Sequence, residues 1–267
     1  MPGLLFQDAT VAATQTWSPP GGETLARLLS SLGGEYLYLL LIPGLLWFAP
    51  WEMAVRAARG MVLADMVGEW IKWTLMWPRP DAALALAQET SPGFVSTHAS
   101  ISMAVALLVG EARPRLRPWL ALWVLGVGWS RLRLGVHYPG DVLGGWVVGT
   151  TVALLLWKFS EDSRRSSAGT LLFGLFLAAI WPEGGGESLQ RDLGMLLGLE
   201  VGLLQRLRAG LQPPPPPLPP GPAAGRLLLL LLGYIGLKTL GCPRLLRYAV
   251  LALIASWRSI PKNSEKI

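Results

Sequence analysis

The chain has 267 residues, of which 52% are hydrophobic and only 15% are charged, whereas a soluble domain carries roughly 25% charged residues. This composition argues against a soluble domain and indicates a protein with several membrane spans, and the net charge of +6 fits basic residues that flank spans better than nucleic-acid binding. The single cysteine, Cys242, excludes a disulfide framework within the chain and a metal site made only of cysteines.

Apolar segments follow one another along most of the chain. The first 35 residues lack the basic start and apolar block of a cleavable signal peptide, and Gly21–Leu32 predicts a short amphipathic helix at the membrane interface. A span needs roughly 17–25 mostly apolar residues, and because several segments are short we expect about six to nine spans. In chain order the candidates are approximately Tyr36–Trp51, Ala54–Trp77, Ser96–Gly110, Pro118–Trp129, Asp141–Lys158, Ser167–Trp181, Leu193–Leu204, Arg226–Leu240 and Leu245–Trp257.

Two features organise these segments. The proline-rich run Pro213–Pro222 predicts a stiff extended linker. Basic residues gather between spans one and two, three and four, and five and six, so the positive-inside rule places these connections in the cytoplasm and the connections after spans two and four outside. Arg79, Arg131 and Arg133 lie in the outer connections against this rule, which indicates another purpose. The cytoplasmic set is Arg56, Arg59, Arg113, Arg115, Arg117, Lys158, Arg164 and Arg165.

The first outer polar patch is KWTLMWPRP, residues 72–80. Lys72 and Arg79 are almost two helical turns apart, and Pro78 and Pro80 predict that the helix ends before Arg79. Two cations near one point at a membrane surface favour an anion site. The alternative is that the long basic side chains simply reach from a helix end to the lipid headgroups.

The second outer patch is FVSTHAS, residues 94–100. Ser96 precedes an apolar run and is a good N-cap, and the backbone N–H groups at a helix N-terminus favour phosphate. His98 would lie in the first turn and face the same anion. The alternative is purely structural, a capping serine followed by an interfacial histidine.

The third outer patch is SRLRLGVHYPGD, residues 130–141, which holds the second of the two histidines in the chain. Pro139 and Gly140 argue against a regular helix between His137 and Asp141. We expect Asp141 to cap the next span and its carboxylate to accept a hydrogen bond from the imidazole, which would fix the tautomer and free the other nitrogen for chemistry. Arg131 adds a planar fork that matches phosphate oxygens.

The three patches form the pattern Lys-x6-Arg-Pro, Ser-x-His and Ser-Arg-x5-His-x3-Asp. This pattern resembles the three-part signature of the type 2 phosphatidic acid phosphatases, the lipid phosphate phosphatases, which are related to glucose-6-phosphatases and vanadium haloperoxidases. The resemblance covers approximately Leu32–Gly149. One departure is that Val95-Ser96-Thr97-His98 replaces the usual Pro-Ser-Gly-His, and threonine at this position is similar to the sphingosine-1-phosphate phosphatases.

The resemblance implies an all-α fold, a polytopic membrane helical bundle with a six-helix phosphatase core and additional C-terminal transmembrane helices. We expect an N-terminal segment with the interfacial helix over residues 1–34, the membrane phosphatase core over 35–160, and C-terminal transmembrane helices over 161–267, with the linker at 213–222. The implied enzyme is a metal-independent phosphatase without a cofactor. Its expected partners are a lipid phosphate and the surrounding membrane lipids, with no nucleic acid, and its site faces the extracytoplasmic side.

The resemblance also implies residue roles. His137 would be the nucleophile and form a phosphohistidine, Asp141 would orient it, and His98 would protonate the leaving alcohol and later help to activate water. The residues implied to hold the phosphate are Lys72, Arg79, Ser96, Thr97 and Arg131.

The substrate is left open by the sequence. The outer loop Asp81–Gly93 is short, which favours an amphiphile such as phosphatidic acid or phosphatidylglycerol phosphate, a polyprenyl diphosphate or a sphingoid phosphate. Two alternatives are a sugar phosphatase like glucose-6-phosphatase and a non-catalytic protein that binds or transports a phospholipid. For three further acids in or near spans, Asp65, Glu69 and Glu200, we expect structural pairing or a helix-end position, although acids within a membrane are functional candidates.

Overall fold

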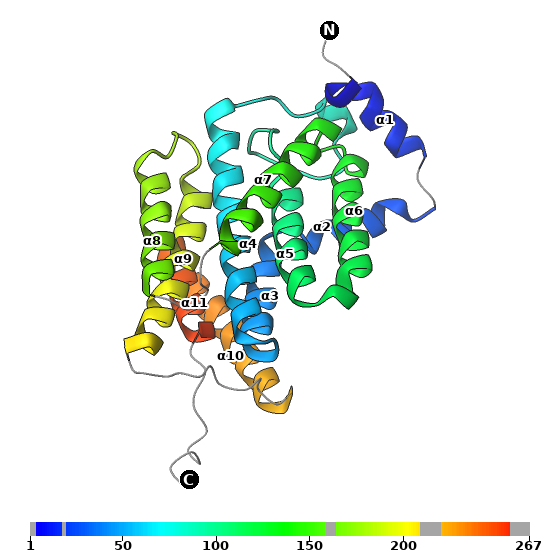
Figure 1. The fold of residues 1–267 in the computed structure, drawn as a ribbon. Helices are drawn as coiled ribbons and strands as arrows, with labels where there is room; N and C mark the ends of the chain where they lie inside the picture. Colours follow the sequence, from blue (N-terminus) through cyan, green and yellow to red (C-terminus); the bar gives the residue numbers. More distant parts are fainter. Residues whose placement is uncertain (1–3, 18–19, 159–163, 209–219, 257–267) are drawn as a thin grey trace.

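A computed structural model describes residues 4–17, 20–158, 164–208 and 220–256 of the chain. All regular elements in these ranges are helices (Figure 1), which confirms the predicted all-α class. Three short 3-10 helices lie at Leu4–Phe6, Ala82–Leu84 and Pro114–Leu116. The α-helices are α1 Asp8–Thr16, α2 Gly22–Ser31, α3 Glu35–Phe48, α4 Trp51–Leu75, α5 Thr97–Ala112, α6 Arg117–Arg133, α7 Pro139–Trp157, α8 Arg164–Ala179, α9 Gly186–Arg208, α10 Pro220–Thr239 and α11 Arg244–Ser256.

The centre of the molecule is the packing of α4, α5, α6 and α7. Helix α5 contacts α4, α6 and α7, and the end of α4, the start of α5, the end of α6 and the start of α7 lie at one end of the bundle (Figure 1). Glycines allow α7 to approach α5 closely: a Cβ at Gly145 would lie 2.3 Å from the carbonyl oxygen of Ser96, and one at Gly149 would lie 2.2 Å from that of Ser100. This contact holds the second polar patch against the third.

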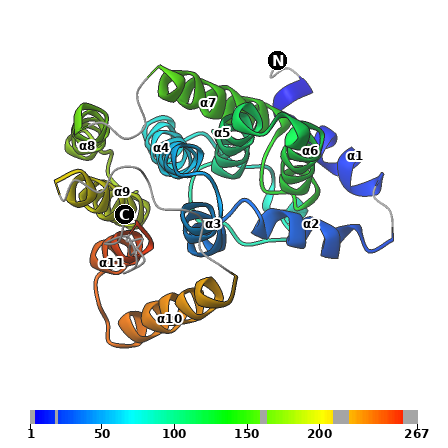
Figure 2. The same ribbon diagram turned by 60° about the horizontal axis from the view of Figure 1, so that its bottom comes forward.

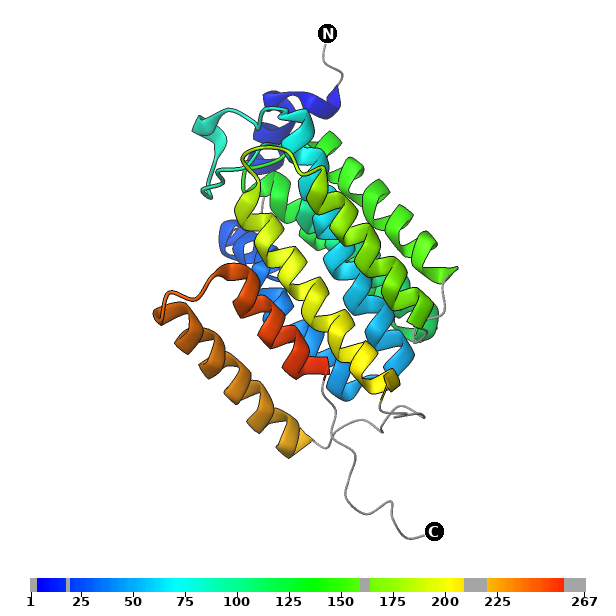
Figure 3. The same ribbon diagram turned by 90° about the vertical axis from the view of Figure 1, so that its left-hand side faces the viewer.

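The C-terminal helices pack on the opposite side of α4. Helix α9 lies between α8 and α11 and contacts α4, whereas α10 contacts α11 and α3 (Figures 2 and 3). A buried ion pair joins α4 to α9, because Arg59 Nε and Nη2 each lie 2.7 Å from a carboxylate oxygen of Glu200. The same guanidinium donates to the hydroxyls of Ser166 and Ser167 on α8, at 2.9 Å each.

The buried pair confirms one expectation and corrects another. Glu200 is structurally paired, as expected. Arg59, which the sequence placed among the basic residues that set topology, instead lies 1% exposed inside the bundle. A buried guanidinium needs a partner of opposite charge, and Glu200, far away in sequence, supplies it.

Several helix boundaries differ from the expected spans. Helix α7 begins at Pro139 rather than near Asp141, and α10 begins at Pro220, inside the predicted extended linker. Both helices start at a proline for the same reason. Proline lacks a backbone N–H, and in the first helical turn that N–H would have no partner within the helix. The linker residues 213–219 lie outside the described residues. Helix α1 was not expected from the sequence.

The helices differ in their capacity to cross a membrane. Within the described ranges, Pro139–Trp157 is the one helix that is long and apolar enough to do so by length and composition, and Thr97–Ala112 and Ser166–Ala179 are shorter apolar helices. Helix α4 has 25 residues but carries several charged groups. Its length therefore suits a span, while its composition is that of a helix covered by neighbours.

Candidate active site

A cavity of about 510 Å³ opens at the end of the bundle where α4 ends and α5 and α7 begin. Its walls come from the connection between α2 and α3, from the loop between α4 and α5, and from α9. All three outer polar patches contribute side chains. The predicted site residues that line it are Lys72, Arg79, Thr97, His98, Arg131 and His137.

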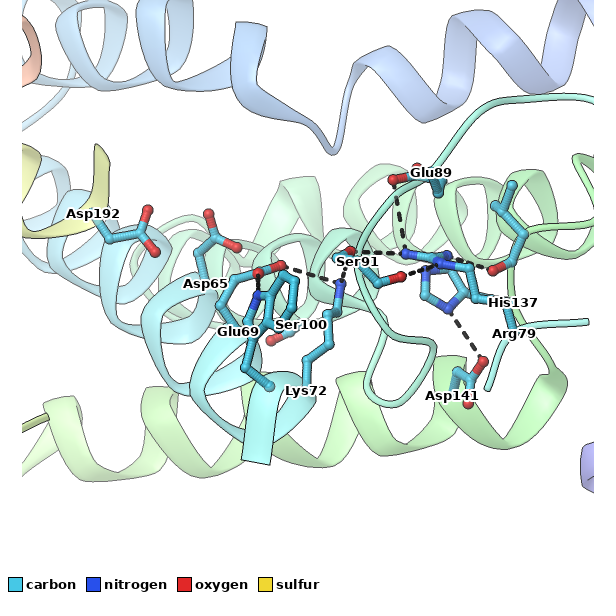
Figure 4. A network of polar contacts seen from close by, with 12 residues as sticks. Asp65, Glu69, Lys72, Arg79, Glu89, Ser91, Ser100, His137, Asp141 and Asp192 are labelled. Carbon is cyan, nitrogen blue, oxygen red and sulfur yellow. Dashed lines mark hydrogen bonds and ion pairs between the residues drawn. The ribbon is translucent and has the colours of Figure 1, made fainter. Parts of the chain in front are cut away.

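His137 lies between α6 and α7 with partners on both ring nitrogens. Its Nδ1 is 3.2 Å from Asp141 Oδ2, and its Nε2 is 3.3 Å from Arg79 Nη1 (Figure 4). A guanidinium only donates hydrogen bonds, so Nε2 must accept and Nδ1 must carry the proton that is donated to Asp141. In this tautomer the Nε2 lone pair accepts the hydrogen bond from Arg79, and the His137 side chain lines the cavity.

The surroundings also keep the His137 imidazole neutral. Burial lowers its pKa well below the usual value, and the positive charges of Arg79, Arg131 and Lys72 lower it further. Both effects disfavour the imidazolium form. A neutral ring whose Nε2 carries no proton is the form that acts as a nucleophile.

Asp141 contacts His137, as expected, but it lies at a different position in the helix than expected. It is the third residue of α7, and Tyr138 is the N-cap. The same Oδ2 that faces His137 accepts the backbone N–H of Tyr138 at 2.9 Å. The expectation that Asp141 is the first, capping residue of the helix is therefore wrong in position: Pro139 and Gly140 belong to the first turn, and the Asp141 carboxylate reaches back from within the helix as part of a capping box.

Arg79 is fixed by three hydrogen bonds to the chain. Helix α4 ends at Leu75, before Arg79 as predicted. The Arg79 guanidinium donates to the carbonyl of Ser91 at 2.7 Å, to its hydroxyl at 3.0 Å and to the carbonyl of Val136 at 2.6 Å. Lys72 Nζ reaches the same Ser91 hydroxyl at 3.4 Å. Ser91, which sequence reasoning missed, therefore joins the two cations of the first patch.

Glu89 is the second residue that sequence reasoning missed. Its carboxylate accepts a hydrogen bond from Arg131 and lies 3.8 Å from Arg79 Nη2, while Arg131 also donates to Ser30 of α2 at 2.5 Å. Burial alone would raise the pKa of Glu89, but the charges of Arg131 and Arg79 outweigh burial and lower that pKa below its usual value. The Glu89 carboxylate thus interacts with Arg131 and Arg79, the two arginines that were expected to bind phosphate.

The second patch starts α5. Ser96 is the N-cap by position, but its side chain makes no capping hydrogen bond, and its buried hydroxyl has no partner among the described residues. Its backbone N–H donates to the carbonyl of Asp141 at 3.0 Å, which joins the second and third patches. Thr97 fits at the usual glycine position because Gly68 of α4 leaves room: a Cβ on Gly68 would lie 2.9 Å from the Thr97 methyl.

The cavity continues beyond the predicted residues toward α9. Asp65 and Glu69 are paired, as expected, with Arg191 at 2.5 Å and Lys72 at 3.1 Å, but both also line the cavity. Arg191 comes from α9, and no spacing in the sequence connected it with the patches. Within the described ranges, no three His, Cys, Asp or Glu side chains are grouped so as to hold a metal ion.

Known proteins resemble this chain over the same region. Residues 54–165 match the family model of the PAP2 superfamily. Decaprenylphosphoryl-5-phosphoribose phosphatase from Mycobacterium tuberculosis is 33% identical over 153 residues, which cover 55% of this chain and 85% of that protein. Undecaprenyl-diphosphatase from Sulfolobus acidocaldarius is 29% identical over 143 residues, covering 49% of this chain and 67% of that protein. The crystal structure of Aquifex aeolicus LpxE has the same fold, with a TM-score of 0.51 at 19% identity, over 57% of this chain and 94% of that one.

Proposed function

The chain belongs to the PAP2 superfamily, and on that premise we propose that it is an integral membrane phosphatase that hydrolyses a phosphomonoester or diphosphate of a lipid through a phosphohistidine. The observation that carries this proposal is the setting of His137, whose Nδ1 faces Asp141 and whose Nε2 faces the cavity and Arg79. The names of the mycobacterial and archaeal relatives, which are phosphatases of polyprenyl compounds, support a lipid substrate.

The first chemical step is attack of His137 Nε2 on phosphorus. The N–P bond forms as the bond from phosphorus to the leaving alcohol oxygen breaks, and His98 gives that oxygen a proton. Asp141 holds the Nδ1–H and stabilises the positive charge that develops on the ring, as the acid does in other nucleophile–histidine sites. In the second step His98 takes a proton from water, the water oxygen attacks phosphorus, and the N–P bond breaks to release inorganic phosphate.

Charge neutralisation falls to the basic side chains of the cavity. Arg79, Arg131 and Lys72 line the same cavity as His137, and at the N-terminus of α5 the hydroxyls of Ser96 and Thr97 are the proposed further donors. The proposed reaction therefore needs no metal ion, and phosphate release that is unchanged by a chelator is the expected result.

We place the site at the extracytoplasmic face of a multi-pass protein. The basic residues Arg113, Arg115 and Arg117 are exposed at the far end of the bundle, where the positive-inside rule expects the cytoplasm. Large apolar side chains are exposed along the outer helices, including Trp119 at 71%, Val147 at 66% and Leu172 at 67%, as suits contact with lipid. In this arrangement residues 35–160 form the phosphatase core and residues 161–267 the C-terminal helices.

The test of the proposed function is phosphate release by the purified full-length protein in detergent. Lipid phosphates of the three classes, with glucose 6-phosphate as the sugar alternative, are assayed with the wild type and with His137→Ala. We expect turnover of at least one lipid phosphate, less turnover of glucose 6-phosphate, and loss of turnover in the variant at an unchanged melting temperature. Retained turnover in His137→Ala would refute the covalent mechanism, and vanadate binding without any turnover would favour the non-catalytic alternative.

A further inference from the structure

The cavity is larger than the proposed reaction alone requires. Pockets of roughly 300–1,000 Å³ hold whole small ligands, and this cavity measures about 510 Å³. Figure 4 shows that His137 and Arg79 occupy one side of the polar network, whereas Asp65 and Glu69 lie on the other, beyond Lys72. We call this second part the α9 lobe. Its polar lining residues are Asp65, Glu69, Trp73, Glu187, Ser188 and Arg191.

The α9 lobe is built where the connection between α8 and α9 lies against α4. Gly184 has φ +96°, and a Cβ there would lie 2.7 Å from the Trp73 ring. A Cβ on Gly185 would lie 2.6 Å from the same ring. The two glycines therefore permit the backbone to cover the indole and fix one wall of the lobe. Residues 184–191 lie outside the region matched by the family model, 54–165.

Every charged side chain that lines the α9 lobe faces at least one group of opposite charge. Asp65 pairs with Arg191 at 2.5 Å, Glu69 pairs with Lys72 at 3.1 Å, and Glu187 pairs with Arg244 at 2.9 Å, a residue of α11. Arg191 in addition faces the fully buried Asp192, at 2.8 Å. Because each of these cations already faces a carboxylate, a second phosphate would meet no spare cation in the lobe.

The hydrogen-bonding capacity of the lobe is not exhausted by this pairing. A carboxylate has about four lone-pair positions and a guanidinium has five N–H donors, so the paired groups still accept and donate. Ser188 adds a hydroxyl close enough to hydrogen-bond Glu69, and Trp73, whose Nε1 donates to Glu69 at 3.1 Å, adds an apolar ring face. This mixture of acceptors, donors and an aromatic face suits a neutral group with several hydroxyls.

We infer that the α9 lobe binds an uncharged, hydroxyl-bearing headgroup, a sugar or glycerol unit, that carries the phosphate removed at His137. The inference rests on the proposed function, since it assigns the rest of the same cavity. The phosphate lies among Arg79, Arg131 and Lys72, and the hydroxyls of the headgroup meet Glu69, Ser188 and Arg191. The preferred substrate class is a lipid with a phosphorylated polyol headgroup, ahead of phosphatidic acid and of a diphosphate.

The test compares three substrates in mixed micelles with the full-length protein: phosphatidylglycerol phosphate, phosphatidic acid with the same acyl chains, and farnesyl diphosphate. The variant Ser188→Leu fills the α9 lobe, Ser188→Ala removes only the hydroxyl, and Thr239→Leu on exposed α10 is the matched control. We expect kcat/KM to be highest for phosphatidylglycerol phosphate in the wild type. Its ratio to phosphatidic acid should fall about tenfold in Ser188→Leu and about threefold in Ser188→Ala, mainly through KM, and stay constant in Thr239→Leu.

Other outcomes refute the inference in distinguishable ways. An equal loss of kcat/KM for all substrates in both Ser188 variants would show that Ser188 has only a structural role. If kcat/KM and its ratio between phosphatidylglycerol phosphate and phosphatidic acid both stay unchanged, the α9 lobe does not take part in substrate binding. If the wild type prefers farnesyl diphosphate, the α9 lobe would instead bind the second phosphate of a diphosphate. In each of these cases phosphate is still released, so the proposed function stands. If the wild type releases phosphate from no lipid, the proposed function fails and the inference fails with it.

Discussion

Replacing Asp141 with asparagine tests the arrangement around His137 most directly. The carboxylate oxygen Oδ2 accepts two hydrogen bonds, from His137 Nδ1 at 3.2 Å and from the backbone N–H of Tyr138 at 2.9 Å. Asparagine keeps the size of the side chain, but its NH2 group donates. If that group faces the imidazole, the ring proton moves to Nε2, which is the atom proposed to attack phosphorus.

The size of the effect follows from these contacts. A hydrogen bond to a charged group contributes about 1.5–3 kcal/mol, and at about 1.36 kcal/mol per tenfold change this alone lowers the rate roughly 10- to 150-fold. The wrong tautomer adds to this loss, since the same change in Ser-His-Asp enzymes lowers kcat about 10⁴-fold. We expect kcat to fall by about 10²- to 10⁴-fold and KM to change less than about threefold, because the phosphate contacts are retained.

The assay is release of inorganic phosphate from a lipid phosphate in mixed micelles over a range of substrate concentrations. Asp81→Asn is the matched control, because Asp81 is exposed and its side chain accepts a local hydrogen bond, from the backbone N–H of Ala83 at 2.9 Å, which asparagine can also accept. The control should keep its kcat, and both variants should unfold at similar temperatures. Retention of more than about a tenth of the wild-type kcat in Asp141→Asn would refute an orienting role for this carboxylate.

Three further predictions concern stability, inhibition and pH. Arg59→Ala leaves Glu200 buried without its cation and should lower the free energy of unfolding by about 3–5 kcal/mol, measured by denaturant titration, with the exposed Glu111→Gln as a near-neutral control. Glu89→Gln removes the carboxylate that lies on the phosphate-binding arginines, so inorganic phosphate should inhibit severalfold more tightly, and weaker inhibition would contradict this competition. Because the pKa of His137 lies well below 6.5, the acidic limb of kcat/KM against pH should fall below pH 6.5. An acidic limb at or above pH 6.5 would contradict the lowered pKa. The same lowered pKa affects stability: the free energy of unfolding should decrease as the pH falls below about 6.5, because only the unfolded imidazole of His137 binds a proton there, and above the unfolded pKa this loss is absent.

Local features of the sequence were sufficient to predict the helical class and most of the helices. Apolar run length and the position of prolines are local properties, so the end of α4 before Arg79 and the start of α5 after Ser96 follow from neighbouring residues. The same holds for the facing of His137 and Asp141, which are only four residues apart. The placement of the three patches at one end of the bundle follows from alternation of the helices along the chain.

Only the tertiary structure decided which distant groups complete the cavity. Glu89 meets Arg131 across 42 residues, and Asp65 meets Arg191 across 126 residues. Such pairs form because a charge taken out of water requires a partner nearby in space, and chain separation does not reveal which partner the packing supplies. The sequence by itself determined which residues are proposed to react and their local order, whereas helix packing, through the close approach of α9 to α4, determined which distant residues line the cavity beside them.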